Sequence, residues 1–199
     1  MEKTLLVATN NSGKLAEFRA LLRPYIGKII GLREAGLQSP EETASTFIEN
    51  ALLKARHASA ASGLAVLADD SGLVVPALGG APGIYSARYA GPQASDQANN
   101  NKLVSMLQKF DGPYSAYYHA SLVLLRSEDD PVPIIAQANW LGEIIAQPAG
   151  SHGFGYDPHF WVSEYQCTAA ELDPALKNQI SHRGKALKIL LSEIQQLSI

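Results

Sequence analysis

Short apolar runs alternate along the chain with longer segments in which apolar residues recur every three or four positions. The runs at residues 4–8 and 64–68 are brief and end at polar or turn-forming residues, so they predict buried strands. The longer period predicts a helix over residues 15–22 and another over residues 47–62, the second opened by the capping box Thr46-Phe-Ile-Glu49. Strands separated by helices are typical of α/β folds.

The second half of the chain adds strands that follow one another directly. Residues 117–125 and 134–140 are rich in β-formers and are joined by the turn Ser127–Pro131, which predicts an antiparallel hairpin. The hairpin therefore predicts a mixed sheet with a second lobe rather than a purely parallel sheet. The other expected elements are short strands near residues 29–30, 142–145 and 160–162, a helix capped by Ser95 or Asp96 with Leu103, Met106, Leu107 and Phe110 inward, a short helix after Asp173 and a final helix after Ser181.

Two adjacent carboxylates end the apolar run at residues 64–68, in the sequence Ala68-Asp-Asp-Ser-Gly72. The carboxyl end of a buried strand lies at the rim of the sheet, where open α/β folds bind ligands. Side chains alternate along a strand, so Asp69 and Asp70 should face opposite sides. Two acids at the end of an apolar strand are costly without a positive partner, and we expect a metal ion to be that partner.

The turn after the first strand, Thr9-Asn-Asn-Ser-Gly-Lys14, suits a phosphate group. Small residues allow close approach of the backbone, the N–H groups of the following helix face an anion, and Lys14 adds a positive charge. The spacing differs from the G-x-x-x-x-G-K-[ST] loop of the common nucleotide hydrolases. A polar turn with a solvated lysine is the alternative.

The helix over residues 47–62 places Lys54 at the edge of its apolar face, where it could reach a phosphate or an acidic partner. Alternatively, its stem covers apolar surface while its ammonium group stays in water. Glu41 and Glu42, on the loop before this helix, are either surface carboxylates or the missing metal ligand. Their spacing does not decide between these roles.

Two further stretches carry unusual chemistry. Ser151-His-Gly-Phe-Gly-Tyr-Asp-Pro158 sets Phe154 between two glycines, so its ring either stacks on a flat ligand or packs into the core. His182 and Arg183 lie in the first turn of the final helix, where the helix dipole disfavours cations unless an anion or acceptor is present. That position favours a ligand-binding role for both residues.

Composition narrows the class of protein. The formal net charge is −3, which argues against a general nucleic-acid binder, although local lysines can still bind a small anion. Cys167 is the only cysteine, so neither an intramolecular disulfide nor a thiolate zinc cluster is expected. No signal peptide or membrane span is evident from the sequence, and we expect a cytoplasmic protein.

Seven motifs occur in one order along nearly the whole chain, and together they resemble the inosine/xanthosine triphosphate pyrophosphatase family. They are Thr9–Lys14, Glu41-Glu-Thr43, Phe47-Ile-Glu-Asn-Ala51-x-x-Lys54-Ala, Ala68–Gly72, Gly79-Gly-Ala-Pro-Gly-Ile-Tyr-Ser-Ala-Arg88, Gly153–Pro158 and Ser181-His-Arg-Gly184. One departure is visible, because many bacterial members have Thr-Gly-Asn where this chain has Thr9-Asn-Asn11. Asn tolerates the left-handed conformation nearly as Gly does, so we expect little harm.

The resemblance implies a single domain over residues 1–199, with an elongated mixed sheet flanked by helices and two lobes with the active-site cleft between them. It also implies a Mg²⁺-dependent homodimer that hydrolyses ITP, dITP and XTP to the monophosphate and pyrophosphate and so removes them from the nucleotide pool. Glu41 and Asp70 would hold the metal, and Asp70 would activate or orient the attacking water. The implied substrate-binding residues are Thr9, Asn10, Asn11, Ser12, Gly13 and Lys14 for the triphosphate, Lys54 and Ser71 beside it, and Phe154, Gly155, Tyr156, Asp157, Lys177, His182 and Arg183 around the base.

The chemistry of the reaction agrees with these roles. Attack on the α-phosphorus requires neutralised charge on the triphosphate and a positioned water, which Mg²⁺ and lysines supply. A pocket rich in donors favours the 6-oxo group of hypoxanthine and xanthine over the 6-amino group of adenine. A pyrimidine-directed pyrophosphatase and a non-catalytic nucleotide-binding regulator are the competing hypotheses.

Overall fold

The computed structural model describes residues 4–196 and contains a seven-stranded sheet with the strand order β2-β1-β3-β4-β5-β6-β7. β1 pairs in parallel with β2 and with β3, whereas β5 with β6 and β6 with β7 are antiparallel, so the predicted mixed sheet is confirmed. The strands are β1 (Thr4–Ala8), β2 (Lys28–Gly31), β3 (Ala65–Val74), β4 (Tyr114–Leu125), β5 (Ile134–Ile144), β6 (Phe160–Val162) and β7 (Cys167–Thr168).

Helices flank the sheet, and most begin where the sequence predicts. The α-helices are α1 (Ser12–Leu22), α2 (Phe47–Ser62), α3 (Asp96–Leu107), α4 (Pro174–Ile180) and α5 (His182–Gln196). Residues 4–196 also contain three short 3₁₀ helices, η1 (Pro76–Leu78) and η2 (Gly83–Arg88) between β3 and α3, and η3 (Asp157–His159) before β6.

The chain divides into two compact units that alternate along the sequence. Unit 1 holds residues 4–70, 120–138 and 183–196, and unit 2 holds residues 71–119 and 139–182. The chain passes from one unit to the other within β3, β4 and β5 and at the start of α5. Neither unit is therefore a continuous segment of the sequence.

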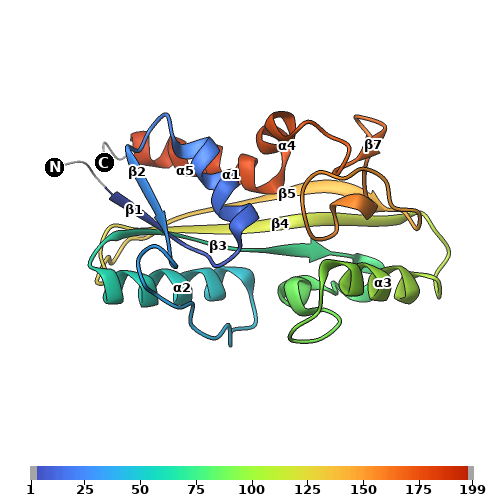
Figure 1. Ribbon diagram of the computed structural model, residues 1–199, viewed down its shortest axis with the longest axis horizontal. Helices are drawn as coiled ribbons and strands as arrows, with labels where there is room; N and C mark the ends of the chain where they lie inside the picture. The colour runs from blue at the N-terminus through green and yellow to red at the C-terminus, as the bar shows by residue number, and fades with distance from the viewer. Residues whose placement is uncertain (1–3, 197–199) are drawn as a thin grey trace. The chain divides into compact units, whose positions relative to one another are not determined.

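In unit 1, α1 and α5 cover one face of the strands and α2 covers the other (Figure 1). The side chains of β1 alternate between these two layers. Leu5 and Val7 pack in a cluster with Phe18 of α1 and Leu187 of α5, whereas Leu6 and Ala8 pack with the alanines of α2. Because both faces are covered, the strand is apolar at almost every position, as its sequence predicts.

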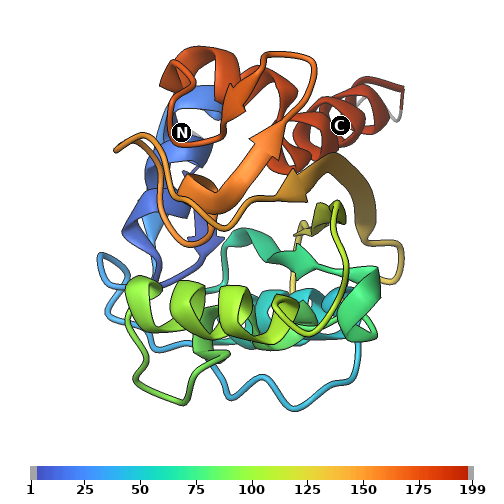
Figure 2. The same ribbon diagram turned by 90° about the vertical axis from the view of Figure 1, so that its right-hand side faces the viewer.

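In unit 2, α3 and α4 lie on opposite sides of the strands (Figure 2). Its core includes Leu103 and Leu107 of α3 together with Trp140 and Phe160. Two predictions in this region are wrong. α3 ends at Leu107, so Phe110 lies beyond the helix and is 43% exposed rather than inward. Residues 134–140 and 142–145 are not separate strands, because β5 runs without a break from Ile134 to Ile144.

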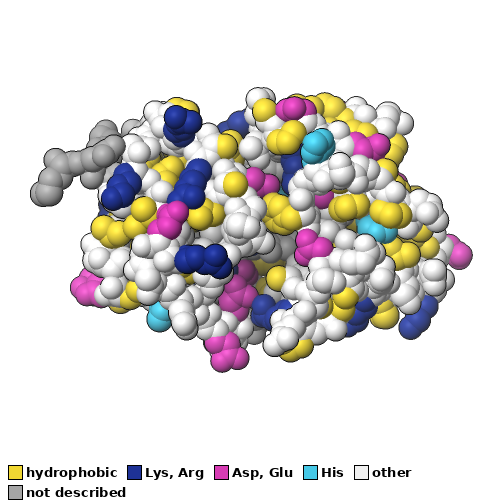
Figure 3. Space-filling view, in the orientation of Figure 1, with side chains coloured by type: hydrophobic (Ala, Val, Ile, Leu, Met, Phe, Trp, Pro, Cys, Tyr) yellow, Lys and Arg dark blue, Asp and Glu magenta, His cyan; other side chains and the backbone are white. Residues whose placement is uncertain are grey.

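The surface carries no dominant sign of charge on the face drawn in Figure 3, where Lys and Arg side chains are interspersed with Asp and Glu. This distribution agrees with the small formal net charge of −3. Within residues 4–196, no helix is both long and apolar enough to cross a membrane.

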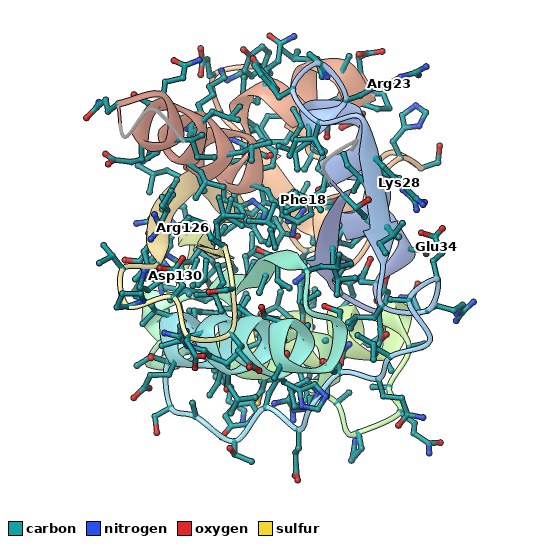
Figure 4. The ribbon with its side chains drawn as sticks, turned by 90° about the vertical axis from the view of Figure 1, so that its left-hand side faces the viewer. Phe18, Arg23, Lys28, Glu34, Arg126 and Asp130 are labelled. Atoms are coloured by element: carbon teal, nitrogen blue, oxygen red, sulfur yellow. The ribbon has the colours of Figure 1, made fainter. Side chains whose placement is uncertain are left out.

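The turn between β4 and β5 is fixed by charge. The Arg126 guanidinium donates to both carboxylate oxygens of Asp130, at 2.8 and 2.6 Å, and Arg56 of α2 donates to the Asp130 carbonyl at 2.7 Å. Figure 4 shows Arg126 and Asp130 side by side in this turn, with Phe18 inside unit 1. The bidentate hydrogen bonds from Arg126 hold the pKa of Asp130 well below its usual range. The Asp130 carboxylate therefore stays ionised at neutral pH, and its ion pair with Arg126 keeps the turn closed.

Candidate active site

The two adjacent acids do not end their strand. β3 continues through Asp69, Asp70 and Ser71 to Val74, so the predicted strand end at residue 68 is wrong. It is β1 that ends there, because Ala8, its last residue, pairs with Ala68. Asp69 and Asp70 therefore lie directly beyond the last residue that β1 pairs, at the carboxyl edge of the parallel strands.

Asp69 is buried among positive charges from α1 and α5. Its Oδ2 atom lies 2.7 Å from Lys14 Nζ and 3.6 Å from Arg183 Nε, and the residue is 1% exposed. Burial opposes ionisation, but the charges of Lys14 and Arg183 outweigh it and hold the pKa of Asp69 well below its usual range. Asp69 is therefore an ionised anchor for two of the predicted substrate-binding cations.

Asp70 has a different environment on the other side of the strand. Lys54 Nζ, from α2, donates to Asp70 Oδ1 at 2.7 Å and to Glu42 Oε1 at 2.8 Å. Burial raises the pKa of Asp70 to about 6, and Lys54 only partly opposes this rise. Lys54 is 5% exposed, so its ammonium group is not in water, and the alternative of a solvated lysine is wrong.

The alternation of β3 explains the separate partners. Asp69 meets residues of α1 and α5, which cover one face of unit 1, and Asp70 meets Lys54 of α2, which covers the other (Figure 1). The prediction that the two acids face opposite sides is thus confirmed. Lysines and an arginine supply the positive charge that the sequence led us to expect from a metal.

The predicted phosphate turn is mostly the first turn of α1. This helix begins at Ser12, and Asn11 is its N-cap, with φ −79° and ψ 114° and a side chain that accepts from the Lys14 N–H at 3.0 Å. Neither Asn10 nor Asn11 has a positive φ, so the turn does not use the left-handed conformation that asparagine tolerates. Asn10, Asn11 and Ser12 are exposed, which leaves the amino-terminal edge of α1 open to an anion.

The acids of the loop before α2 differ in position. Glu42 is half-buried and bonded to Lys54, whereas Glu41 is exposed. Across residues 4–196, no three His, Cys, Asp or Glu side chains gather around one point as a preformed metal cage. The residues nevertheless fit Mg²⁺, which binds proteins through one or two carboxylates and keeps several waters. Asp70 Oδ2 is buried and accepts no hydrogen bond from any described residue, so it is available as such a ligand.

Unit 2 gathers the predicted base-binding residues around Asp157. Its carboxylate accepts from the Phe154 N–H at 2.9 Å, from the Tyr118 hydroxyl at 3.1 Å and from Lys177 Nζ at 2.6 Å. Lys177 Nζ also lies 5.0 Å from the centre of the Phe154 ring. A Cβ atom at Gly153 would overlap the Asp157 carboxylate, so this carboxylate requires glycine there. Asp157 is 3% exposed, and its contacts hold the loop that carries Phe154.

The remaining predicted residues of unit 2 have mixed surroundings. Tyr156 is buried, and its hydroxyl donates to the Ser86 carbonyl at 2.7 Å, while burial raises its pKa. The His182 ring stacks on Tyr118, with 4.8 Å between ring centres. Ser71 follows Asp70 on β3 and is half-buried, and Phe154 is half-buried as well. Gly155 has φ +64°, the left-handed conformation that favours glycine.

Arg183 shows why a cation is tolerated at the start of α5. Its guanidinium pairs with Glu17 of α1, so the protein itself supplies the anion that the sequence led us to expect. Sequence reasoning missed Glu17 and Tyr118. Glu17 lies three residues after Lys14, on the same side of α1, and this spacing was the available signal. Nothing in the sequence around Tyr118 indicates its contact with Asp157.

Comparisons with known proteins give one consistent result. The model of the Ham1 family matches residues 5–193. The dITP/XTP pyrophosphatase of Burkholderia pseudomallei is 53% identical over 196 residues, covering 97% of this chain and 94% of that protein. The dITP/XTP pyrophosphatase of Vibrio cholerae is 50% identical over 195 residues, covering 98% of each.

A solved structure agrees in fold. The HAM1 protein from Coxiella burnetii superposes with a TM-score of 0.89 at 47% sequence identity, covering 98% of this chain and 99% of that one. The family model spans nearly all of the chain, and the relatives share about 50% sequence identity with it, so both comparisons lead to the same conclusion. The chain belongs to the Ham1 family.

Proposed function

We propose that the chain hydrolyses dITP, ITP and XTP to the nucleoside monophosphate and pyrophosphate in a Mg²⁺-dependent reaction. Its membership of the Ham1 family and its curated relatives make it a nucleoside-triphosphate pyrophosphatase. The observation that carries the proposal is Asp70 Oδ2, a buried carboxylate oxygen that accepts no hydrogen bond from residues 4–196, on a carboxylate whose other oxygen pairs with Lys54. Such an oxygen suits a metal ion or an attacking water.

The cations of unit 1 support binding of the triphosphate. Lys14 and Lys54 each pair with a strand carboxylate, and Lys14 belongs to the first turn of α1, whose N–H groups are open to an anion. Thr9 Oγ1 accepts from the Asn11 N–H at 3.2 Å, which keeps the preceding turn in shape. When the triphosphate binds, we expect the two lysines to share their charge between the protein carboxylates and the phosphate oxygens.

Asp70 and one acid of the Glu41-Glu42 pair would hold Mg²⁺. When bound, the ion neutralises phosphate charge and polarises the bond that breaks. Glu42 is bonded to Lys54 while Glu41 is exposed, so Glu41 is the acid that is free to turn toward an incoming ion. Asp70 would orient the attacking water through its second oxygen.

The donors of unit 2 support recognition of the base. Lys177 offers an ammonium group beside Phe154, and Phe154 offers an aromatic face. A 6-oxo purine accepts hydrogen bonds where adenine donates them, so ATP leaves these donors mismatched. Removal of deaminated nucleotides from the cytoplasmic pool follows from this preference. We also propose that the working molecule is a homodimer.

A product assay tests the function. The protein is incubated with ITP, XTP, dITP, GTP, ATP and dTTP, with and without Mg²⁺, and pyrophosphate and orthophosphate are measured separately. We expect pyrophosphate from ITP, XTP and dITP and no turnover in EDTA. Orthophosphate as the first product would refute a pyrophosphatase, and a preference for dTTP would indicate a pyrimidine-directed enzyme.

Two matched variants separate catalysis from binding. Asp70→Asn should lower turnover by about 10²-fold or more, because the metal and the water lose their carboxylate. Asp129→Asn, at an exposed acid of the β4–β5 turn, should leave it unchanged. Tight ITP binding without Mg²⁺-dependent turnover in the wild type would instead indicate a nucleotide-binding regulator.

A further inference from the structure

Helix α3 holds both backbone groups of Gly155. Asp96 Oδ2 accepts from the Gly155 N–H at 2.7 Å, and Asn100 Nδ2 donates to the Gly155 carbonyl at 2.9 Å. The two side chains lie four positions apart, on one side of the helix. Gly155 directly follows Phe154, so this pair of bonds fixes the peptide next to the predicted stacking residue.

No neighbouring group packs against the side of Gly155 where a side chain would stand, among the residues that the structure describes. Its φ of +64° is accessible to glycine at low cost, and a Cβ built there would touch nothing within 4 Å. Steric contact around the α-carbon therefore does not restrict this residue. Hydrogen bonds from α3 supply the restraint that packing does not.

Asn100 shows that the restraint has a cost. The residue is 5% exposed, and its Oδ1 accepts no hydrogen bond from any part of the chain that the structure describes. An apolar side chain would avoid this buried, unsatisfied acceptor. Asn is nevertheless present, and its amide group is the one that reaches the Gly155 carbonyl. Asp96, in the first turn of α3, is favoured there by the helix dipole.

On the other side of Phe154, its own N–H donates to Asp157 at 2.9 Å. Consecutive N–H groups of the loop are thus tied to two different carboxylates, Asp157 for Phe154 and Asp96 for Gly155. Loss of either hydrogen bond is enough to let the backbone rotate at Gly155. The Phe154 ring then loses its fixed direction.

We propose that Asp96 and Asn100 are positioning residues that fix Phe154 for stacking on the purine base. This inference rests on the proposed function. It predicts that loss of the α3 bonds weakens recognition of the base and leaves recognition of the triphosphate intact, because Lys14, Lys54 and Asp70 belong to unit 1.

The test uses Asp96→Ala, Asn100→Ala and the conservative Asp96→Asn, whose amide oxygen can still accept from Gly155. Gln97→Ala is the matched control, because Gln97 is on the same turn of α3 and bonds to Asn101 at 2.8 Å. Loss of well-oriented stacking should raise the KM for ITP about tenfold in each alanine variant. The kcat should stay within about twofold of the wild type. Asp96→Asn should keep a KM near that of the wild type.

Two readouts separate positioning from general damage to the fold. Inhibition by inorganic tripolyphosphate, which has no base, should be unchanged in every variant. In a Phe154→Ala background, Asp96→Ala should add little to the KM, because its effect acts through the missing ring. Asn100→Ala keeps the test valid if Asp96→Ala does not fold.

The outcomes are distinct. An unchanged KM for ITP in both alanine variants, weaker tripolyphosphate inhibition, or effects of Asp96→Ala and Phe154→Ala that multiply in full would each overturn the positioning role. Failure of the wild type to release pyrophosphate from ITP would overturn the proposed function itself. This result comes from the wild-type protein alone, so it is distinct from the outcomes that concern the variants.

Discussion

Asp69 and Asp70 are neighbours in the chain, yet ionisation has opposite effects on their contributions to stability. The pKa of Asp69 is lowered on folding, so its contribution is present above its unfolded pKa, near 4, and is lost as the pH falls. The pKa of Asp70 is raised to about 6, so its contribution is present at low pH and is lost as the pH rises through about 6. One acid anchors cations, and the other is held in an unfavourable charged state.

Substitution by asparagine should expose this difference. At pH 8 without Mg²⁺, Asp69→Asn should lower the free energy of unfolding by about 3 kcal/mol, because it breaks a buried charge pair. Asp70→Asn should leave the free energy of unfolding unchanged or raise it, because the substitution removes a buried charge while Lys54 keeps its ion pair with Glu42. Urea unfolding at pH 5 and pH 8 measures both variants. Equal destabilisation by the two substitutions at pH 8 would contradict the assignment.

The first turn of helix α1 has a structural role beside the binding role proposed for it. The Asn11 side chain caps the helix by accepting from the Lys14 N–H, so the residue that shapes the turn also sets the backbone of the lysine that we propose binds phosphate. An N-cap of this kind leaves the remaining N–H groups of the turn free for an anion.

Removal of this cap should affect both properties. Asn11→Ala should lower the free energy of unfolding by about 1 kcal/mol and raise the KM for ITP, whereas Asn11→Ser should restore most of the stability. The neighbouring, exposed Asn10 gives the control, and Asn10→Ala should change stability by less than about 0.5 kcal/mol. Urea unfolding and steady-state kinetics measure the two effects. An equal loss of stability from both alanine substitutions would argue against the cap.

The loop over residues 153–157 contains two glycines with different reasons for their presence. Gly153 has φ +77°, and a Cβ there would overlap the Asp157 carboxylate and approach Lys177 Nζ at 3.0 Å. Gly155 has only its positive φ, with open space around the α-carbon. The first glycine therefore permits a close approach, and the second only a backbone conformation.

Alanine should separate these two reasons. Gly155→Ala should cost about 1 kcal/mol, the penalty of the left-handed conformation. Gly153→Ala should cost at least about 2 kcal/mol more, because it also displaces the carboxylate that bonds Phe154, Tyr118 and Lys177. Thermal unfolding ranks the two variants. A smaller loss of stability from Gly153→Ala than from Gly155→Ala would show that the loop can shift to accommodate a Cβ beside Asp157.

Elements with local signals could be predicted from the sequence, and elements that depend on distant partners could not. The Thr46 cap predicts the start of α2, and Asp173 with Pro174 predicts the start of α4, because each cap bonds within its own first turn. The full length of β3 could not be predicted, because two charges in a strand are stable only with Lys14 and Lys54 from other elements. The early start of α1 was missed because Ser12 and Gly13 are typical of turns.

The same distinction applies to the site. Lys14, Lys54, Asp69 and Asp70 could be selected from their motifs, but the sequence could not show which lysine meets which acid. The bond between Lys177 and Asp157, twenty positions apart, depends on the packing of α4. Asp96 and Asn100 carry no motif signal, since an acid in the first turn of a helix is common.

At the level of the complete chain, the two units share three strands. β3, β4 and β5 each contribute residues to both units, so neither unit can lose its strands without disturbing those of the other. Both tryptophans, Trp140 and Trp161, belong to unit 2, whereas most helical residues belong to unit 1. Two optical probes therefore report on different units.

Unfolding should be cooperative across the chain. Tryptophan fluorescence, which reports on unit 2, and circular dichroism at 222 nm, dominated by the helices of unit 1, should give coincident urea transitions. The shared strands are the physical reason. Two transitions with separate midpoints would show that the units unfold independently despite them.

The interleaved sequence also bears on how the protein is made. Unit 1 starts with β1 and is completed only by α5, whose Ala186 and Leu187 cover Leu5 and Leu67. On the ribosome, β1 and β3 emerge more than a hundred residues before the helix that shields one of their faces. Domains commonly fold in the order of synthesis, but this unit is completed only after α5 has been synthesised. Until α5 emerges, only α1 can cover this apolar face, so part of the face stays exposed on the growing chain, and we expect chaperones that protect growing chains to bind there.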